Sequence, residues 1–270
     1  MRTIPFVAVL ATLAAAAPVT EASPTATVEA EKPAAPAPVD LRRTSHRFVP
    51  NLGRNIVGMF SRDNLVPFAI VVGATTAAIP FDDNVQRYFG GGERKAAWWG
   101  DFADALGSPF VLTPMAIVLY GAGRLAPHHQ RFRNATYDIG QVFLVGAVYT
   151  TTLKYATQRE RPDGSDNLSF PSGHTSNAFA WATVANHYYG LKVGIPSYAV
   201  ATFIGIGRME KNAHHLTDVV AGAGLGYLVG RTVTRRDSEP LPGTHARQFG
   251  ISPSSGPGGR GVGLTASLQF

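Results

Sequence analysis

The chain has 270 residues, a net charge of +6 with histidine counted as neutral, and 16% charged residues. This length suits one domain of ordinary size, and the charged share is below the roughly 25% typical of soluble proteins. Cysteine is absent, which excludes disulfides, thiolate metal sites and cysteine nucleophiles. The positive charge favours an anionic partner, such as a membrane surface or a phosphate ester. No nucleic-acid-binding motif accompanies the charge, so a nucleic acid is not an expected partner.

The N-terminal residues 1–22 have the pattern of a secretory signal peptide. Arg2 is followed by an apolar run over Ile4–Ala17, and then by small residues with a cleavage position after Ala22. An uncleaved membrane anchor is the alternative, although the run is short for one. Residues 23–40 are rich in Pro, Ala, Thr and Glu and are expected to form a linker.

A helical domain is expected over residues 41–236. Its first part, Leu41–Arg62, mixes arginines with apolar residues, which is typical of a helix lying on an anionic membrane or of a helix packed on a bundle. Six apolar segments follow, at about 65–80, 109–123, 139–156, 174–190, 194–208 and 218–232. Each is roughly 15 to 18 residues long, which suits buried helices and is short of the ~20 residues of a membrane span. We therefore predict an all-α fold, a six-helix bundle.

Residues 237–270 differ in composition from the helical domain. Pro, Gly and Ser are frequent up to Gly261, and apolar and polar residues then alternate from Val262 to Phe270. A period of two indicates a half-buried strand. We expect an irregular tail with a possible terminal strand.

Three clusters of polar residues lie where the expected helices end: Lys154 and Arg161 in KYATQRERP, Ser172, Gly173 and His174 in FPSGHTS, and Arg208, His214 and Asp218 in GRMEKNAHHLTD. Arginine forks and a lysine charge suit phosphate oxygens. A Ser-Gly pair before a helix directs backbone N–H groups and the helix dipole towards an anion. An aspartate four residues after a histidine can fix its tautomer and leave the other ring nitrogen able to attack. Each cluster alone is common in structural roles, so the inference depends on their combination and spacing.

The combination K-x6-R-P, P-S-G-H and R-x5-H-x3-D resembles the signature of the PAP2 superfamily, which includes lipid phosphate phosphatases, bacterial acid phosphatases and vanadium-dependent haloperoxidases. The resemblance covers about residues 50–232 and implies the helical bundle of that family. It also implies no metal and no other cofactor in the phosphatases. The implied roles are phosphate binding by Lys154, Arg161, Arg208, Ser172 and the Gly173 amide, nucleophilic attack by His214, orientation of His214 by Asp218, and protonation of the leaving alcohol by His174.

Two positions depart from the pattern of the family. Gly207 replaces a frequent serine before Arg208, and Leu216–Thr217 replaces a frequent Pro-Ser before the aspartate. Neither position supplies the main chemistry, so we expect these changes to affect the fine tuning of the activity more than the activity itself. His215 also lies within helical reach of the aspartate, although the spacing favours its neighbour His214 as the nucleophile.

The expected function is hydrolysis of phosphate monoesters through a phosphohistidine intermediate. The apolar surroundings and the basic N-terminal segment favour lipid phosphates such as phosphatidic acid as substrates. Three alternatives stay open: a soluble periplasmic non-specific acid phosphatase, a vanadate-dependent haloperoxidase, and a non-enzymatic helical membrane protein with a decayed site.

The two signals of localisation disagree. The signal peptide predicts export, yet most arginines outside the motifs lie at the bundle end opposite them, which places the N-terminus of a membrane-spanning bundle in the cytoplasm. The short apolar segments and a mean hydropathy of +0.02 favour an exported domain that does not fully span the bilayer. We therefore expect a periplasmic or membrane-associated protein that rests on the membrane surface.

Overall fold

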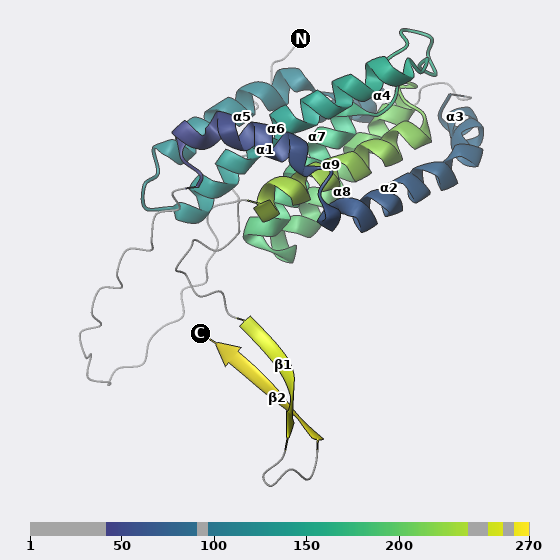
Figure 1. The fold of residues 1–270 in the computed structure, drawn as a ribbon. Coiled ribbons are helices and arrows are strands. Elements are labelled where there is room, and N and C mark those ends of the chain that lie inside the picture. Colours follow the sequence, from purple (N-terminus) through teal and green to yellow (C-terminus); the bar gives the residue numbers. More distant parts are fainter. Residues whose placement is uncertain (1–41, 91–96, 237–247, 256–261, 270) are drawn as a thin grey trace, which may run out of the picture. The chain divides into compact units, whose positions relative to one another are not determined.

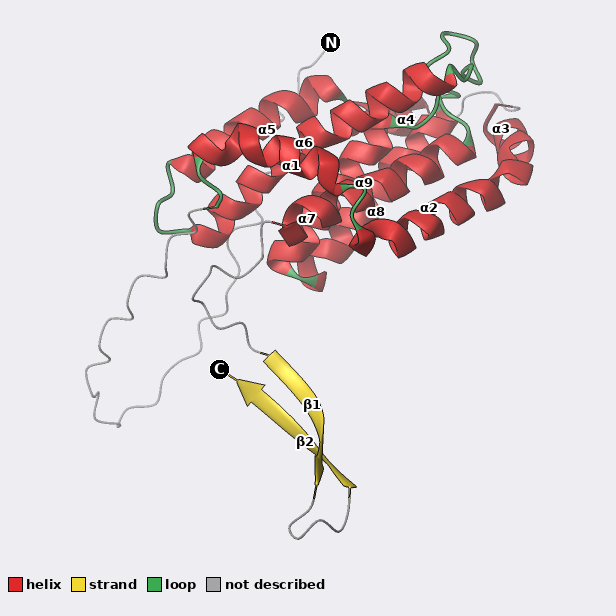
Figure 2. Cartoon of the chain, viewed as in Figure 1, coloured by secondary structure: helices red, strands yellow, loops and turns green. Residues whose placement is uncertain are grey.

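The computed structural model describes residues 42–90, 97–236, 248–255 and 262–269. The expected signal peptide and linker lie outside these residues. Within them, short 3-10 helices lie at η1 (Ser45–Arg47), η2 (Arg62–Asn64) and η3 (Ile79–Phe81). The α-helices of the described residues are α1 (Phe48–Gly58), α2 (Leu65–Ala78), α3 (Asp82–Gly90), α4 (Ala97–Gly107), α5 (Pro109–Arg124), α6 (Gln130–Thr157), α7 (Gly173–Tyr189), α8 (Leu191–Glu210) and α9 (Leu216–Arg236) (Figures 1 and 2).

The all-helical character of the domain is confirmed, but the predicted count of six helices is too low for the described residues. The six expected segments lie in α2 and in α5 to α9. The additional helices are α1, in the basic segment, and α3 and α4, whose sequences contain no long apolar run. Several helices also extend beyond the apolar segments: α6 has 28 residues, because its polar start QRFRNATYD is helical too.

The hydrophobic core forms where α6, α7 and α9 meet. Val142 and Val145 of α6, Val184 of α7, and Val229 and Val233 of α9 are fully buried in one cluster. Full burial of a side chain of this kind contributes about 1.5–3 kcal/mol. This cluster holds together the three helices that carry Lys154, Gly173, His174 and Asp218 of the predicted site.

Helix α9 approaches α7 closely through glycines four residues apart. Gly222, Gly226 and Gly230 share one face of α9, since residues at this spacing are neighbours on a helix. A Cβ atom at Gly222 would lie 2.6 Å from the carbonyl oxygen of Ser172, and one at Gly226 would overlap the carbonyl oxygen of Ser176. The glycines therefore bring the start of α9 against the start of α7, where the second and third motifs lie.

The basic N-terminal segment packs on the bundle, which is one of its two expected arrangements. Asn51 of α1 is fully buried and donates a hydrogen bond to the hydroxyl of Tyr137 of α6 at 2.8 Å. Upstream of α1, the buried guanidinium of Arg43 pairs with Asp138 at 2.9 Å. A buried charge requires such a partner, so the segment is tied to α6.

An apolar surface is exposed on α2 and α5. Within the described residues, the segment Arg62–Phe89 is long and apolar enough to cross a membrane, and only 11% of its apolar stretch is buried. Trp98–Gly107 and Pro109–Arg124 meet the same criteria as a pair bent by 42°. Phe68 of α2 is 52% exposed and Phe110 of α5 is 92% exposed. The prediction that all apolar segments are buried inside the bundle is therefore wrong for these helices.

The described part of the tail forms an antiparallel hairpin of β1 (Gln248–Ser255) and β2 (Val262–Gln269). Gln248 pairs with Gln269 and Ser255 with Val262. Strand β2 coincides with the alternating segment of the sequence. Its partner β1 lies in the stretch expected to be irregular, because Pro253 and its neighbouring serines interrupt any alternation.

Replacing Gly226 by alanine is expected to destabilise the protein, because the added methyl group meets the backbone of α7. Overpacking of this kind costs about 1–3 kcal/mol, measurable by thermal or denaturant unfolding of the purified protein. The matched control is Gly73→Ala on α2, where nothing lies within 4 Å of the added Cβ. Alanine is favoured over glycine inside a helix by about 0.5–1 kcal/mol, so the control is expected to unfold no earlier than the wild type. Equal stabilities of the two variants would contradict the close contact of α7 and α9.

Candidate active site

Four helix ends that carry the predicted motifs meet at one end of the bundle. Helix α6 ends at Thr157, where Gln158 adopts a left-handed conformation with φ of 45°. The loop that follows leads to α7, and the loop after Glu210 leads from α8 to α9. Since successive helices reverse direction, both loops lie at the same end. The three motifs are thereby brought together from sequence positions more than 50 residues apart.

A pocket of about 300 Å³ opens among these helix ends. The predicted residues that line it are Lys154, Arg161, Gly173, His174, Arg208 and His214. Ser172 and Asp218 do not line the pocket and are fully buried. The rest of the wall comes largely from α5 and α6 and includes Pro109, Phe143 and Ala147. One wall is therefore cationic, and another is apolar.

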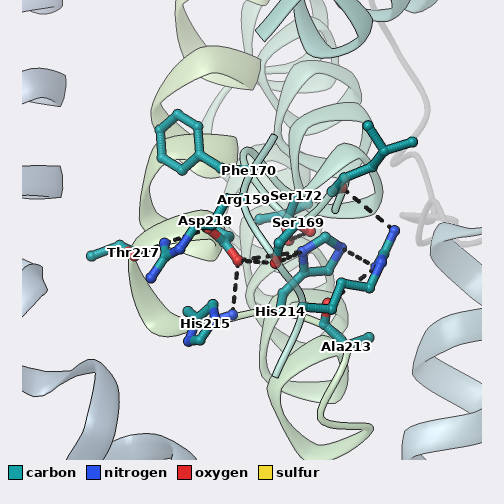
Figure 3. Close-up of polar contacts among 12 residues, drawn as sticks. Arg159, Ser169, Phe170, Ser172, Ala213, His214, His215, Thr217 and Asp218 are labelled. Atoms are coloured by element: carbon teal, nitrogen blue, oxygen red, sulfur yellow. Dashed lines mark hydrogen bonds and ion pairs between the residues drawn. The ribbon is translucent and has the colours of Figure 1, made fainter. Parts of the chain in front are cut away.

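His214 is held by polar contacts at both ring nitrogens (Figure 3). Its Nε2 lies 3.3 Å from an Nη1 donor of Arg161. Because a guanidinium can only donate, Nε2 accepts and the ring proton is on Nδ1. Nδ1 faces Oδ2 of Asp218 at 3.6 Å, an ion-pair distance longer than a hydrogen bond, and lies 3.5 Å from Oγ of Ser169.

The protonation state of His214 suits a nucleophile. Burial lowers the pKa of His214 to about 4; Asp218 acts in the opposite direction, and the charges of Arg208 and Lys154 add to the lowering. The imidazole is therefore neutral at pH 7, with the lone pair of Nε2 at the pocket.

The buried carboxylate of Asp218 accepts hydrogen bonds from several elements. Oδ2 accepts from Oγ of Ser169 at 2.5 Å and from the backbone N–H of His215 at 2.9 Å, and Oδ1 accepts from Nη1 of Arg159 at 2.6 Å. Burial alone raises the pKa of Asp218, but the interaction with His214, the hydrogen bond from Ser169 and the charge of Arg159 outweigh it and lower the pKa to about 2. Asp218 is thus ionised and fixed.

The three predicted cations lie close together at the pocket. Lys154 donates to the carbonyl oxygen of Leu168, and burial, together with the charge of Arg161, lowers its pKa to about 8. Arg161 donates to the carbonyl oxygen of Ala213 at 3.0 Å. Nε of Arg208 is buried with no hydrogen-bond partner in the described part of the chain. An unpartnered buried donor fits an oxyanion as ligand.

His174 lies on the first turn of α7 and contacts a residue that the motifs do not include. Its Nε2 is 3.2 Å from Oδ1 of Asp104 on α4, and the same oxygen contacts Arg208. Burial, followed by the charges of Arg161 and Lys154, lowers the pKa of His174 to about 4. Asp104 is therefore the carboxylate that can stabilise a proton on His174.

Ser172 stands at the N-cap of α7, but its geometry differs from the prediction. Its hydroxyl makes no capping hydrogen bond and instead accepts from the hydroxyl of Thr175 at 2.9 Å. Its backbone N–H donates to the carbonyl oxygen of Asp218 at 3.0 Å. Ser172 thus joins α7 to α9 behind the pocket. Ser172 itself does not line the pocket, whereas Gly173 does.

The two adjacent histidines face different surroundings, as Figure 3 shows. His215 places Nε2 3.3 Å from the carbonyl oxygen of Glu160 and leaves Nδ1 buried without a partner in the described residues. It does not line the pocket. The side chain at the pocket is that of His214, which agrees with the preference derived from spacing.

The sequence model described as the PAP2 superfamily matches residues 137–239, a range that contains all three motifs. Residues 137–239 thus form a region similar to the PAP2 superfamily, called the PAP2 region. The resemblance inferred from the motifs is thereby confirmed. The PAP2 region begins within α6, so α1 to α5, including Asp104, lie outside the matched range.

Several curated proteins are similar to this chain. The chain is 46% identical over 80 residues to lipid A 1-phosphatase of Porphyromonas gingivalis, covering 28% of this chain and 18% of that protein. It is 30% identical over 142 residues to phosphatidylglycerophosphatase B of Bacillus subtilis, covering 46% and 66%. It is 27% identical over 171 residues to a probable diacylglycerol pyrophosphate phosphatase 1 of Schizosaccharomyces pombe, covering 47% and 61%. The matches thus span less than two thirds of each relative.

A solved structure supports the fold. The crystal structure of a transmembrane PAP2 type phosphatidylglycerolphosphate phosphatase from Bacillus subtilis superposes with a TM-score of 0.54 at 21% sequence identity. The superposition covers 64% of this chain and 94% of that one. The arrangement of helices therefore resembles that of this solved structure.

Sequence reasoning missed four polar residues of the site: Ser169, Arg159, Asp82 and Asp104. Arg159 lies within the first motif and Ser169 directly before the second, and they contact Asp218 across 59 and 49 residues. Asp82 and Asp104 lie far upstream, in segments that carry no motif. No spacing rule indicates such contacts, because they arise only when the helices pack.

Proposed function

We propose that this chain is a lipid phosphate phosphatase that hydrolyses phosphate monoesters through a phosphohistidine on His214. The observation that carries the proposal is the pocket itself: three cations and two histidines surround a hollow of about 300 Å³. The neutral imidazole of His214 supplies the nucleophile, and Lys154, Arg161 and Arg208 supply the positive charge. Positioning and electrostatic stabilisation account for most of the catalysis of phosphoryl transfer.

The reaction follows in two steps from the placement of the two histidines. In the first, Nε2 of His214 bonds to phosphorus while the bond from phosphorus to the alcohol oxygen breaks, and the imidazolium of His174 gives its proton to that oxygen. In the second, water attacks the phosphohistidine, neutral His174 takes the proton from the water, and the bond from nitrogen to phosphorus breaks. Phosphate leaves, and both histidines return to their starting states.

The proton on His174 depends on the charge of the substrate. In the arrangement described, the nearby cations lower the pKa of His174 to about 4. A phosphate ester bound to those cations offsets their charge and favours the imidazolium form. Asp104, 3.2 Å away, favours it as well. Substrate binding thereby prepares the acid that the first step requires.

The apolar parts of the protein support a lipid rather than a soluble ester. Pro109, Phe143 and Ala147 line the pocket beside the cations, and they lead to α5, whose Phe110 is 92% exposed. An acyl chain in contact with this wall is removed from water at about 25 cal/mol per Å² of buried area. The similar proteins named above include phosphatases of lipid A, phosphatidylglycerophosphate and diacylglycerol pyrophosphate. Membrane association through α2 and α5 belongs to the same proposal.

A phosphate-release screen of the purified full-length protein tests the substrate class. Phosphatidic acid, phosphatidylglycerophosphate and lipid A in detergent micelles are compared with p-nitrophenyl phosphate, and halide oxidation is measured after addition of vanadate. We expect kcat/KM to be higher for a lipid phosphate than for p-nitrophenyl phosphate, because only the lipid contacts the apolar wall. A preference for p-nitrophenyl phosphate would favour a non-specific acid phosphatase, and halide oxidation a haloperoxidase.

Two adjacent histidines provide a matched test of the nucleophile. His214→Ala is expected to abolish turnover, since it removes the nitrogen that attacks phosphorus; loss of a catalytic nucleophile costs on the order of 10⁶ in kcat. His215→Ala is expected to retain most activity, because its side chain does not line the pocket. Turnover on the same lipid phosphate measures both variants. Full activity of His214→Ala, or loss of activity only in His215→Ala, would refute the assignment.

A further inference from the structure

A second cavity lies behind the catalytic pocket, at the junction of η3 and α3. It has a volume of about 510 Å³, and its wall includes Asp82, Arg159 and Thr217. None of the residues that line it also lines the catalytic pocket. The three polar residues therefore do not touch a phosphate bound in the pocket, and their contacts with one another require another explanation.

Asp82 binds the first turn of α9 from outside the helix. It is 7% exposed and is the first residue of α3. Its Oδ1 accepts the backbone N–H of Thr217 at 2.9 Å, and its Oδ2 accepts the hydroxyl of the same residue at 2.7 Å. The first N–H groups of a helix have no partner within the helix, and a carboxylate is favoured there. Asp82 thus fixes the position of the helix start that carries Asp218.

Arg159 joins Asp82 to Asp218. Its Nη2 donates to Oδ2 of Asp82 at 2.7 Å, and its Nη1 donates to Oδ1 of Asp218 at 2.6 Å and to the hydroxyl of Thr217 at 2.5 Å. Figure 3 shows Arg159 and His214 on different sides of Asp218. A guanidinium is planar and rigid, so its two ends set the separation of the two carboxylates.

We propose that Asp82 and Arg159 are positioning residues that fix the carboxylate of Asp218, and through it the imidazole of His214, at the catalytic pocket. The inference rests on the proposed function, because it concerns the nucleophile of that reaction. It goes beyond the family match, since Asp82 lies outside residues 137–239. It also ties catalysis to the α2–α3 junction, which is the end of the most exposed apolar helix.

The two oxygens of Asp218 show why a second support is needed. Oδ2 faces His214 and accepts from Ser169 and from a backbone N–H, whereas Oδ1 is bonded to Arg159. Among the lysine and arginine residues of the described chain, Arg159 is the one in ion-pair contact with this carboxylate. Burying a carboxylate without a cation costs free energy. Without Arg159, we therefore expect the carboxylate of Asp218 to rotate towards other donors. Such a rotation would move Oδ2 away from His214.

Asp82→Asn and Arg159→Met in the full-length protein test the proposal, together with Asp218→Asn and the double variant Asp82→Asn/Asp218→Asn. Phosphate release from the lipid substrate is measured for each variant. For Asp82→Asn and for Arg159→Met we expect kcat to fall about 10- to 100-fold, the size associated with a misplaced catalytic group. We expect KM to change little. Asp82→Asn is expected to cost nothing further once Asp218 is already asparagine, because the two changes act through one interaction. Asp83→Asn is the matched control, since Asp83 is the exposed neighbour on the same turn, and it should behave as wild type.

A second readout does not require turnover. In ¹⁵N NMR of histidine-labelled protein, with His214→Ala used for assignment, wild-type His214 should show the proton on Nδ1, and Asp82→Asn should shift the ring towards the other tautomer. Failure of every substrate in the screen would refute the proposed function, while the NMR result would still decide the positioning role. Unchanged His214 signals would overturn the proposal. Equal losses of kcat when Asp82→Asn is introduced into the wild type and into Asp218→Asn would also overturn it. So would losses of kcat that are explained by a lowered melting temperature of the variants.

Discussion

The structure at this end of the bundle depends on the burial of one carboxylate. Asp218 is completely removed from water, and it remains ionised only because donors from separate elements surround it. An ionised carboxylate without such donors would cost several kcal/mol to bury. The loop between α6 and α7 supplies Arg159 and Ser169, and the turn before α9 supplies a backbone N–H. Satisfying this one group therefore brings together the elements that carry the candidate site.

Asp218 separates two groups of charged residues, one behind it and one at the pocket. Behind Asp218, Arg159 bridges the carboxylates of Asp82 and Asp218, so that part of the site is net negative. In front of it, Lys154, Arg161 and Arg208 line the pocket with no carboxylate of the lining itself. Asp104, on α4, contacts Arg208 from the side. The result is a neutral imidazole with charge gathered where a phosphoryl group would stand, which is the arrangement that electrostatic catalysis requires.

Much of the fold was predictable because long apolar segments without strand alternation favour helices. The segments that became α2 and α5 to α9 are of this kind. By contrast, α3 and α4 have 9 and 11 residues and contain no long apolar run, so no such segment indicated them. The exposure of Phe68 and Phe110 was also not predictable, since an apolar helix has the same sequence whether its surroundings are protein or lipid.

The candidate site divides in the same way. His174, His214 and the three cations could be found because the chemistry of phosphate binding restricts residue types and their spacing along the chain. The supporting residues could not: Asp82 reaches Thr217 across 135 positions, and a lone aspartate has no sequence signal. The absence of a capping hydrogen bond from the Ser172 side chain was not predictable either, because a capping position does not reveal which way the side chain turns. Residues that would contact the phosphate form a recognisable pattern in the sequence. The residues that support them are brought into place only by the packing of the helices.

A structure of the full-length protein with bound vanadate tests the central claim most directly, because vanadate mimics the phosphoryl group in its transition state. We expect vanadium in the pocket, bonded to Nε2 of His214, with the vanadate oxygens in contact with Lys154, Arg161 and Arg208. Vanadium bonded to His174 or His215, or bound elsewhere on the protein, would contradict it.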